Sequence, residues 1–405
     1  MIYLLIIFAF VVLSFIYDYR QARKWRALWW IVMMVVLICV AGFRYQMGTD
    51  SIKYEEHYKW EHTLSHLSSS DFKDTRYAPL YIIFSSICRT ITPEFMLVQF
   101  VIAILVNVTV FRFIWLHTRH IFLAGLLYSF FLYFMLNMEV LREAMAVCIF
   151  LWAWPLYVKG KWVWFYLCAA AAFLFHVSAV ILFLLPLINI PGVRWFFELG
   201  QRTWFIVAGI LLLSFAMHYF FFDLIQAIAV NDTMAERAEK YSKDDLGGNL
   251  LNIAGAVMWI GRGALYPIIA LCFLKDKKRL VGETDESARK FEAMAMMQIY
   301  VVFLSIGISI FQRYFHYFQL FSLIIVADWA YTVFKVRGRK VRLNFVYWCI
   351  LLAPCFFFQL KSIYLNNFEG SKTLKHYNMY YPYSNQFDKE IAPERRKVIH
   401  LSWRL

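Results

Sequence analysis

The chain alternates long apolar runs with short polar stretches. Most of the runs extend for about 17–23 residues, the length of helix that crosses a hydrocarbon core of about 30 Å. They lie at about 2–17, 28–43, 94–116, 121–137, 142–158, 162–176, 177–190, 204–222, 251–274, 293–311, 315–334 and 343–360. The pattern predicts an all-α, polytopic integral membrane protein of about twelve transmembrane helices.

One further apolar stretch is too short to cross a membrane. Pro79–Ile91 would rise only about 20 Å as a helix, and it contains Arg89. We interpret it as re-entrant or interfacial. The sequence then predicts a single transmembrane domain at 1–360, with external loops at 44–93 and 223–249, and a polar C-terminal tail at 361–405.

Basic residues predict the orientation of the chain. Arginine and lysine crowd positions 20–26, so we expect the loop after the first run to be cytoplasmic. The second run then returns to the outside, and the stretch Phe43–Asp50, FRYQMGTD, emerges externally. The later basic clusters also fall on the cytoplasmic side, provided that Pro79–Ile91 does not cross.

Composition narrows the class of protein further. The chain is 61% hydrophobic and 17% charged, unlike a soluble domain. Its net charge of +14 fits basic cytoplasmic loops, and the absence of a solvated basic face argues against nucleic-acid binding. The seven cysteines lie in apolar runs without paired spacing, so neither a disulfide framework nor a metal site is expected. We expect no cofactor, and we interpret the first run as a retained anchor in the lipid bilayer.

Unusual polar residues collect at the predicted outer helix ends. Ionisable groups near the hydrocarbon are costly and tend to mark function. The unusual polar residues at these helix ends are Arg44, Asp50, Asn137, Glu139, Arg142, His176, Arg237, Lys240, Tyr241, Arg313, Tyr314 and His316. Guanidinium groups bind phosphate oxygens in a bidentate manner and stay charged, so arginines at this depth suit a lipid diphosphate.

Each candidate also has a structural alternative. Arg142 could pair with Glu139, three residues away on one helical face. His176 could hydrogen-bond to a backbone carbonyl, and Arg313 could extend toward lipid phosphates. Asp50 could cap the helix that follows the Gly-Thr pair.

Several stretches together resemble a known family. They are FRYQMGTDxxxY after the second run, the Pro of YAPLY, the NxxxxRE turn, FHVSA and the late RYFHY. Their order over roughly residues 1–335 resembles the EpsG-like group of bacterial polysaccharide polymerases, which are Wzy-like enzymes for exopolysaccharide or O-antigen. The matched positions in this chain are Arg44, Asp50, Arg142, His176, Arg313 and Tyr314.

The resemblance implies a reaction at the outer face of the bacterial inner membrane. Oligosaccharide repeats linked to undecaprenyl diphosphate would be joined there, without a nucleotide or an obligatory metal. We hypothesise that Arg142 and Arg313 hold the diphosphate, that Asp50 or His176 takes the acceptor proton, and that Arg44 orients Asp50 or a sugar. A flippase and a chain-length regulator of the same pathway are the expected protein partners.

Two other functions remain open at this point. A transporter or flippase for lipid-linked glycans would carry charges within its spans, and Arg262 lies in the middle of the run at 251–274. Arg262 would then mark a broken helix, unless the boundaries of the run are misplaced. A membrane acyltransferase could use His176, although one histidine in a turn is a weak signal.

Overall fold

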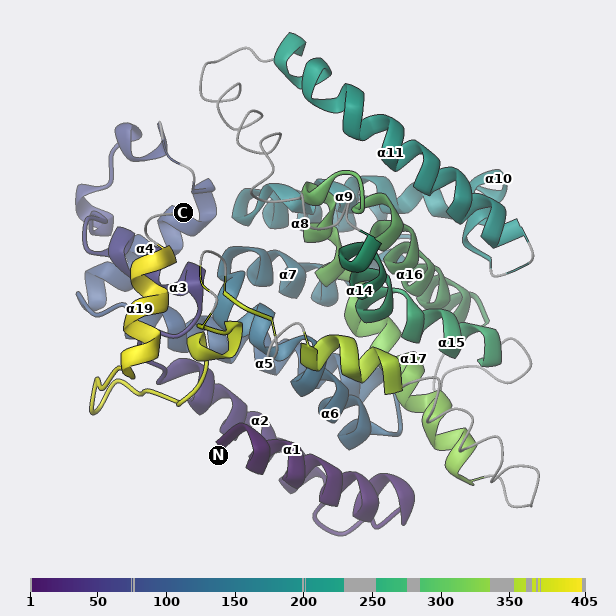
Figure 1. Ribbon diagram of the computed structural model, residues 1–405, viewed down its shortest axis with the longest axis horizontal. Coiled ribbons are helices and arrows are strands. Elements are labelled where there is room, and N and C mark those ends of the chain that lie inside the picture. Colours follow the sequence, from purple (N-terminus) through teal and green to yellow (C-terminus); the bar gives the residue numbers. More distant parts are fainter. Residues whose placement is uncertain are drawn as a thin grey trace. The chain divides into compact units, whose positions relative to one another are not determined.

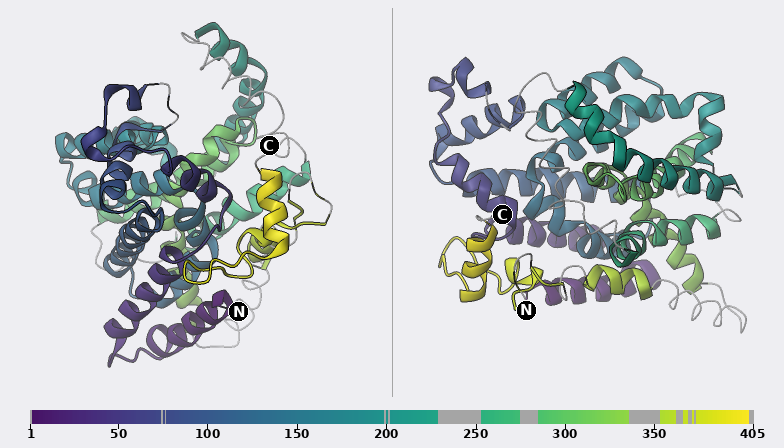
Figure 2. Two further views of the ribbon diagram at one scale, coloured as in Figure 1. Left: turned by 90° about the vertical axis from the view of Figure 1, so that its left-hand side faces the viewer. Right: turned by 45° about the horizontal axis from the view of Figure 1, so that its top comes forward.

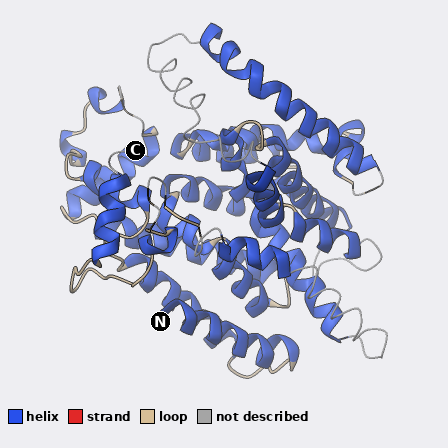
Figure 3. Cartoon of the chain, in the orientation of Figure 1, coloured by secondary structure: helices blue, strands red, loops and turns tan. Residues whose placement is uncertain are grey.

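The computed structural model is all-α, as predicted (Figure 3). It describes residues 2–73, 75, 77–198, 200, 202–228, 253–274, 285–335, 353–361, 366–368, 371 and 373–402. Within these ranges no β-strand occurs, and the extended backbone makes two isolated bridges, Arg44 with Asn385 and Asn367 with Lys375. The predicted fold class is therefore confirmed as all-α.

The chain divides into two compact units. Unit 1 joins Met1–Pro186 to Leu360–Leu405, and unit 2 comprises Leu187–Gln359. The C-terminal residues thus belong to the same unit as the N-terminal half. The predicted division into a transmembrane domain at 1–360 and a separate tail stays a prediction.

Unit 1 is a bundle of helices around the long helix α5 (Figure 1). Its helices include α1 (Ile2–Leu13), η1 (Ser14–Tyr19), α2 (Arg26–Gly42), α3 (Thr49–Tyr58), η2 (Leu64–His66), η3 (Ser69–Phe72), α4 (Pro79–Ile91), α5 (Met96–His117), α6 (Ile121–Phe131), η4 (Met135–Glu139), α7 (Leu141–Val158), α8 (Trp162–Phe175), η5 (Val177–Ala179), α9 (Val180–Leu184), η10 (His376–Met379) and α19 (Pro393–Ser402). Helix α5 packs against α2 and α7. Close packing of α2 depends on Gly42, because a Cβ there would overlap the ring of Phe100.

Helices α7 and α8 form an antiparallel hairpin. Only Lys159, Gly160 and Lys161 connect them, and Gly160 adopts the positive φ of +67° that such a tight turn needs. The two helices pack along their lengths, side by side in Figure 1. The start of α7 and the end of α8 therefore lie at the same end of unit 1.

Apolar side chains remain exposed on the outer helices of unit 1. Leu4 and Phe8 on α1 are each 66% exposed, and Val163 on α8 is 72% exposed. An aqueous surface this rich in large apolar groups would be costly, whereas a lipid surface favours it. These faces are suited to contact with lipid tails.

The prediction of about twelve spans is not confirmed. Three described helical stretches are long and apolar enough to cross a membrane: Ile2–Tyr19, Met96–His117 and Leu141–Val158. Counting each of two bent helix pairs as one span raises the number to five. The structure divides other predicted runs into shorter pieces. The run at 177–190 becomes short helices around Pro186, and most of the run at 343–360 lies outside the described residues.

Helix α4 has the predicted bounds, and both of its ends contact the same polar stretch. Tyr81 in its first turn packs against Tyr54 of α3, with ring centroids 5.6 Å apart. At the other end, Tyr58 donates a hydrogen bond to the carbonyl oxygen of Thr92 at 2.9 Å. Residues of α3 therefore contact both ends of α4. The interpretation that α4 is re-entrant or interfacial stays a prediction.

Unit 2 is built from α10 (Pro191–Arg194), η7 (Trp195–Phe197), α11 (Arg202–Ile228), α14 (Ile253–Gly263), α15 (Leu265–Leu274), α16 (Asp285–Leu304), η8 (Ser309–Tyr314) and α17 (Phe315–Lys335). The predicted run at 251–274 is broken after Gly263, where the helices bend by 45°. Gln298 of α16 donates a hydrogen bond to the Gly263 carbonyl oxygen at 2.6 Å, satisfying an acceptor that the break releases. Arg262 thus lies beside a true break.

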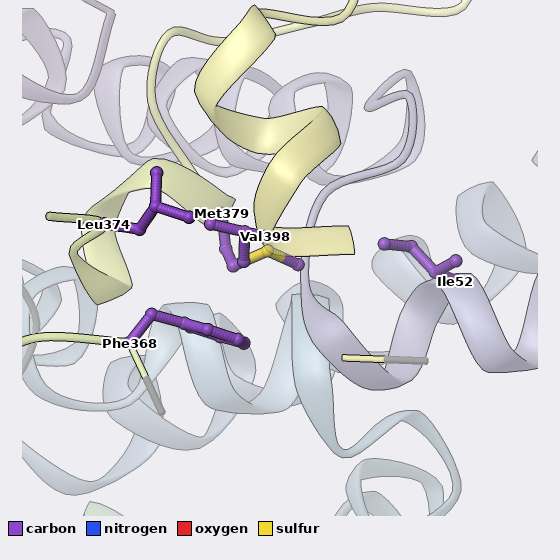
Figure 4. Close-up of a cluster of buried hydrophobic side chains, with 5 residues drawn as sticks. All are labelled: Ile52, Phe368, Leu374, Met379 and Val398. Atoms are coloured by element: carbon purple, nitrogen blue, oxygen red, sulfur yellow. The ribbon is translucent and has the colours of Figure 1, made fainter. Parts of the chain in front are cut away.

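The C-terminal segment, residues 366–402, folds against α3 (Figure 2). Its side chains Phe368, Leu374, Met379 and Val398 form a small apolar core with Ile52 of α3 (Figure 4). The segment is also held internally by a buried arginine. Arg395 donates hydrogen bonds to the Ser384 hydroxyl at 2.7 Å and to the backbone carbonyls of Asn378 and Pro382.

Candidate functional site

The second residue of the FRYQMGTD stretch, Arg44, is fully buried. Arg44 follows α2, and its guanidinium donates hydrogen bonds to the Ala41 carbonyl oxygen and, at 3.0 Å, to the Ser51 hydroxyl. Gln99 of α5 donates to the same hydroxyl at 3.2 Å. These bonds tie the end of α2 to the first turns of α3. Arg44 is therefore placed as a structural anchor, and its predicted role toward a sugar stays a prediction.

Burial governs the electrostatics of Arg44. Loss of hydration lowers the pKa of its guanidinium to about 10, although Tyr133, Glu139 and Tyr383 nearby favour the charged form. At neutral pH the group remains charged. Glu139 is one of the groups that favour this charge.

Gly48 allows α3 to begin close to η4. Its φ is +88°, and a Cβ there would overlap the Met138 carbonyl oxygen and crowd the Glu139 carboxylate. Glu139 accepts a hydrogen bond from the Asp50 backbone N–H at 3.2 Å. The structure does not place Asp50 as the cap of this helix. Gly48 occupies the cap position, and Asp50 lies inside the first turn.

Arg142 lies over a group of tyrosine rings. Its Nε donates a hydrogen bond to the Tyr54 hydroxyl at 3.0 Å, and its guanidinium carbon lies 4.7 Å from the centre of the Tyr77 ring. Tyr77 stacks on Tyr81, with centroids 5.6 Å apart. Such cation–π contacts hold the planar guanidinium in a fixed orientation while it stays partly exposed.

Asp50 and Tyr54 are four residues apart on α3, so they share a helix face. Burial raises the pKa of Tyr54 to about 12, with Arg142 opposing that shift and Asp50 adding to it. Tyr54 thus stays a neutral phenol whose pKa is affected by both charged groups. The structure brings Asp50, Tyr54 and Arg142 into one electrostatic group.

Asn137 belongs to a buried hydrogen-bond network. It donates to the Tyr128 hydroxyl at 2.9 Å, and its Oδ1 accepts from Asn107 at 2.7 Å. Tyr128 donates in turn to the amide oxygen of Asn107 at 3.1 Å. A network satisfied in this way fixes η4 against α5 and α6, and so fixes the position from which Glu139 projects.

His176 lies in the turn that ends the α7–α8 hairpin. It is buried, and its Nδ1 accepts a hydrogen bond from the Ser178 backbone N–H at 3.3 Å, with the Ser178 hydroxyl 2.6 Å away. An accepting Nδ1 is unprotonated, which leaves the proton of a neutral ring on Nε2. His176 therefore caps η5, and the antiparallel hairpin brings it to the same end of unit 1 as Arg142.

The C-terminal segment completes this end of unit 1. Tyr45 N–H donates to the Ser384 carbonyl oxygen at 3.0 Å, and Gln386 N–H donates to the Phe43 carbonyl oxygen at 2.9 Å. Gln386 also binds the Arg44 carbonyl oxygen through its side chain, at 3.0 Å. The segment thereby pairs with the FRYQMGTD stretch. Its composition carries no apolar run that could have predicted this contact.

The remaining predicted residues do not belong to unit 1. Arg313 and Tyr314 lie in η8 of unit 2, where Arg313 is exposed and Tyr314 is half-buried. Arg237 and most of the predicted loop at 223–249 lie outside the described residues. Within the described ranges no group of three or more His, Cys, Asp or Glu side chains could hold a metal ion.

These observations define a class of protein. An all-α chain whose described residues contain three to five candidate spans, with a polar arginine–carboxylate–tyrosine group at one helix end, is a membrane protein of the polytopic type. More particularly, residues 27–385 match the model of the EpsG family, so the chain belongs to this family of polysaccharide polymerase-like proteins. No curated protein and no solved structure matches it.

Proposed function

We propose that this protein joins oligosaccharide repeats carried on a lipid diphosphate, with undecaprenyl diphosphate as the carrier. The products are O-antigen or exopolysaccharide, made at the outer face of the bacterial inner membrane. The observation that carries the proposal is the grouping of Arg142, Tyr54 and Asp50 at one helix end in a member of the EpsG family.

In the proposed reaction, Arg142 binds the donor diphosphate. Tyr54 and Tyr77 fix the plane of the guanidinium, so it meets phosphate oxygens without first losing side-chain freedom. Charge develops on the leaving diphosphate as the glycosidic bond to it breaks, and a fixed cation stabilises that charge.

Asp50 is the proposed general base. The hydroxyl oxygen of the acceptor unit forms a new bond to the anomeric carbon, and its proton passes to the Asp50 carboxylate. The old bond from that carbon to the diphosphate breaks, and the lipid diphosphate leaves with the electron pair. His176 is the alternative base, since the hairpin brings it to the same end of unit 1. To accept a proton, it would first have to release the Nδ1 bond to Ser178, because that bond leaves the ring proton on Nε2.

The test is polymerisation by the purified protein. Wild-type chain given lipid-linked repeat units is expected to yield a ladder of longer products. Asp50→Asn keeps the shape of the side chain and removes the base, so it should still bind the repeats and produce almost no ladder. Asp71→Asn is the matched control, because Asp71 is partly exposed and contacts Ser68 and His62 of the external loop. Normal polymerisation by Asp50→Asn would remove Asp50 as the base.

A second candidate function rests on the break between α14 and α15. Discontinuous helices with nearby polar groups are typical of transporters, and Arg262 lies beside this break. Reconstituted vesicles test it. Movement of the lipid-linked repeat between leaflets, with no longer products formed, would favour a flippase over a polymerase.

A further inference from the structure

Glu139 is shared between the C-terminal segment and the start of α3. Its Oε2 accepts a hydrogen bond from the Asp50 backbone N–H at 3.2 Å, and its Oε1 accepts one from the Tyr380 hydroxyl. The side chain is 8% exposed. One buried carboxylate therefore links α3 to a tyrosine that lies 241 residues from Glu139 in sequence.

The contact with Asp50 is made where a helix most favours an anion. The first N–H groups of a helix have no partner within it, and the helix dipole is positive at this end. Gly48 supplies no side chain that could fill this place, so Glu139 supplies the acceptor from η4. The Glu139 carboxylate thus helps to hold the first turn of α3, which carries Asp50.

Tyr380 is itself held firmly by its own segment. Its ring packs on Phe134, with centroids 5.1 Å apart, and its backbone N–H bonds to the Tyr377 carbonyl oxygen at 2.9 Å. Arg395, fully buried, ties both sides of this turn together through Asn378 and Ser384. These contacts fix the position from which the Tyr380 hydroxyl binds Glu139.

We propose that Glu139 and Tyr380 are positioning residues, which set the Asp50 carboxylate and the Tyr54 hydroxyl against Arg142. The inference rests on the proposed function for its effect on turnover. Neither residue needs to touch a substrate. Tyr380 orients Glu139, Glu139 orients the first turn of α3, and that turn carries Asp50. Because misplacement of a reacting group by about 1 Å can cost about 100-fold in rate, this chain of contacts affects turnover rather than binding.

The test compares two tyrosines of the same segment. Tyr380→Phe removes the hydroxyl that binds Glu139 and keeps the ring on Phe134. Tyr383→Phe is the matched control, because the Tyr383 hydroxyl donates instead to the Val40 carbonyl oxygen, at 3.1 Å. Each variant loses one hydrogen bond between the segment and the bundle, so a purely structural role predicts the same result for both.

We expect Tyr380→Phe to lower kcat by about tenfold or more, with KM within about twofold of wild type. Tyr383→Phe should retain a kcat close to that of wild type. Glu139→Gln, which leaves one good acceptor for two donors, should match Tyr380→Phe. The double variant should lose little more than either alone, because both act through one contact. Equal losses in Tyr380→Phe and Tyr383→Phe, or additive losses in the double variant, would overturn the proposal.

A second measurement separates this inference from the proposed function. Amide hydrogen exchange over residues 49–54 reports on the first turn of α3 without any substrate. Exchange there should be faster in Tyr380→Phe and unchanged in Tyr383→Phe. If wild type makes no polymer, the proposed function fails, and the exchange data still decide the positioning role: unchanged exchange in Tyr380→Phe rejects it.

Discussion

At the scale of the residue, Arg44 and Arg142 have opposite surroundings. Arg44 is fully buried, and its bonds go to the protein's own backbone and to Ser51. Arg142 is partly exposed and lies against tyrosine rings. Part of the Arg142 side chain therefore reaches the surface, whereas contact with Arg44 would need the end of α2 to move.

Arg142→Lys tests whether the planar guanidinium is needed, or only its positive charge. Lysine keeps the charge and loses both the planar fork and the Tyr54 bond, so we expect polymerisation to fall by about 100-fold. Protein abundance should stay near that of wild type. Product ladders from equal amounts of membrane protein measure the change.

Arg112→Lys is the control for that substitution. The Arg112 guanidinium also stacks on an aromatic ring, at 3.9 Å from the centre of Trp152, yet it lies near the far end of α5. It should polymerise as wild type does. If Arg142→Lys instead lowers abundance and keeps the activity per molecule, its role is structural and the diphosphate contact is rejected.

The sequence was enough to select the candidate charged residues, but it did not predict their bonding partners. The cost of burying charge is enough to single out Arg44, Asp50, Arg142 and His176 from residue type and position alone. Helical spacing offered Glu139, three residues away, as an alternative partner for Arg142. The structure shows Arg142 on Tyr54 and Glu139 on Asp50 and Tyr380, contacts that span 88 residues or more. Local spacing carries no information about such partners.

At the scale of the element, α3 depends on one glycine. Gly48→Ala would place a methyl group against the Met138 carbonyl oxygen and a side chain at a φ of +88°. We expect a loss of about 1–3 kcal/mol in the stability of this region, together with reduced activity. Thermal unfolding of the purified protein in detergent measures it.

Gly209→Ala provides the comparison for Gly48. Gly209 lies in α11, has no positive φ, and an added Cβ would meet nothing within 4 Å. Alanine favours helix more than glycine does, so this variant should be as stable as wild type or slightly more stable. Equal thermal shifts in the two variants would show that α3 does not require the backbone freedom of Gly48.

Element boundaries followed the hydropathy pattern where helices are uninterrupted. The run at 142–158 is α7 within one residue, and Pro79–Ile91 is α4 with identical bounds. The pattern failed where backbone chemistry intervenes. Hydropathy alone did not show that the run at 251–274 bends after Gly263, although Arg262 within the run had suggested a broken helix. Hydropathy also did not show that polar residues beyond 366 fold into η10 (His376–Met379) and α19. Such a segment folds through specific bonds and a few apolar contacts, which leave no periodic signal.

At the scale of the whole molecule, the proposed function requires a particular orientation in the membrane. In a variant without the seven native cysteines, Ser65→Cys should react with an impermeant maleimide in intact spheroplasts. Ser65 is exposed in the loop between α3 and α4. Lys24→Cys, exposed in the basic loop after η1, should react only after lysis. The reverse labelling would place the candidate site in the cytoplasm and end the proposed function.

The pairing of Gln386 with Phe43 and Arg44 has a consequence for biosynthesis. Gln386 and Arg44 are 342 residues apart. A ribosome releases the FRYQMGTD stretch long before residue 386 has been translated, so the nascent chain must wait with this end of unit 1 incomplete. Most premature stop codons would thus leave Glu139 without Tyr380. The site can therefore be completed only in chains that have been translated past residue 386.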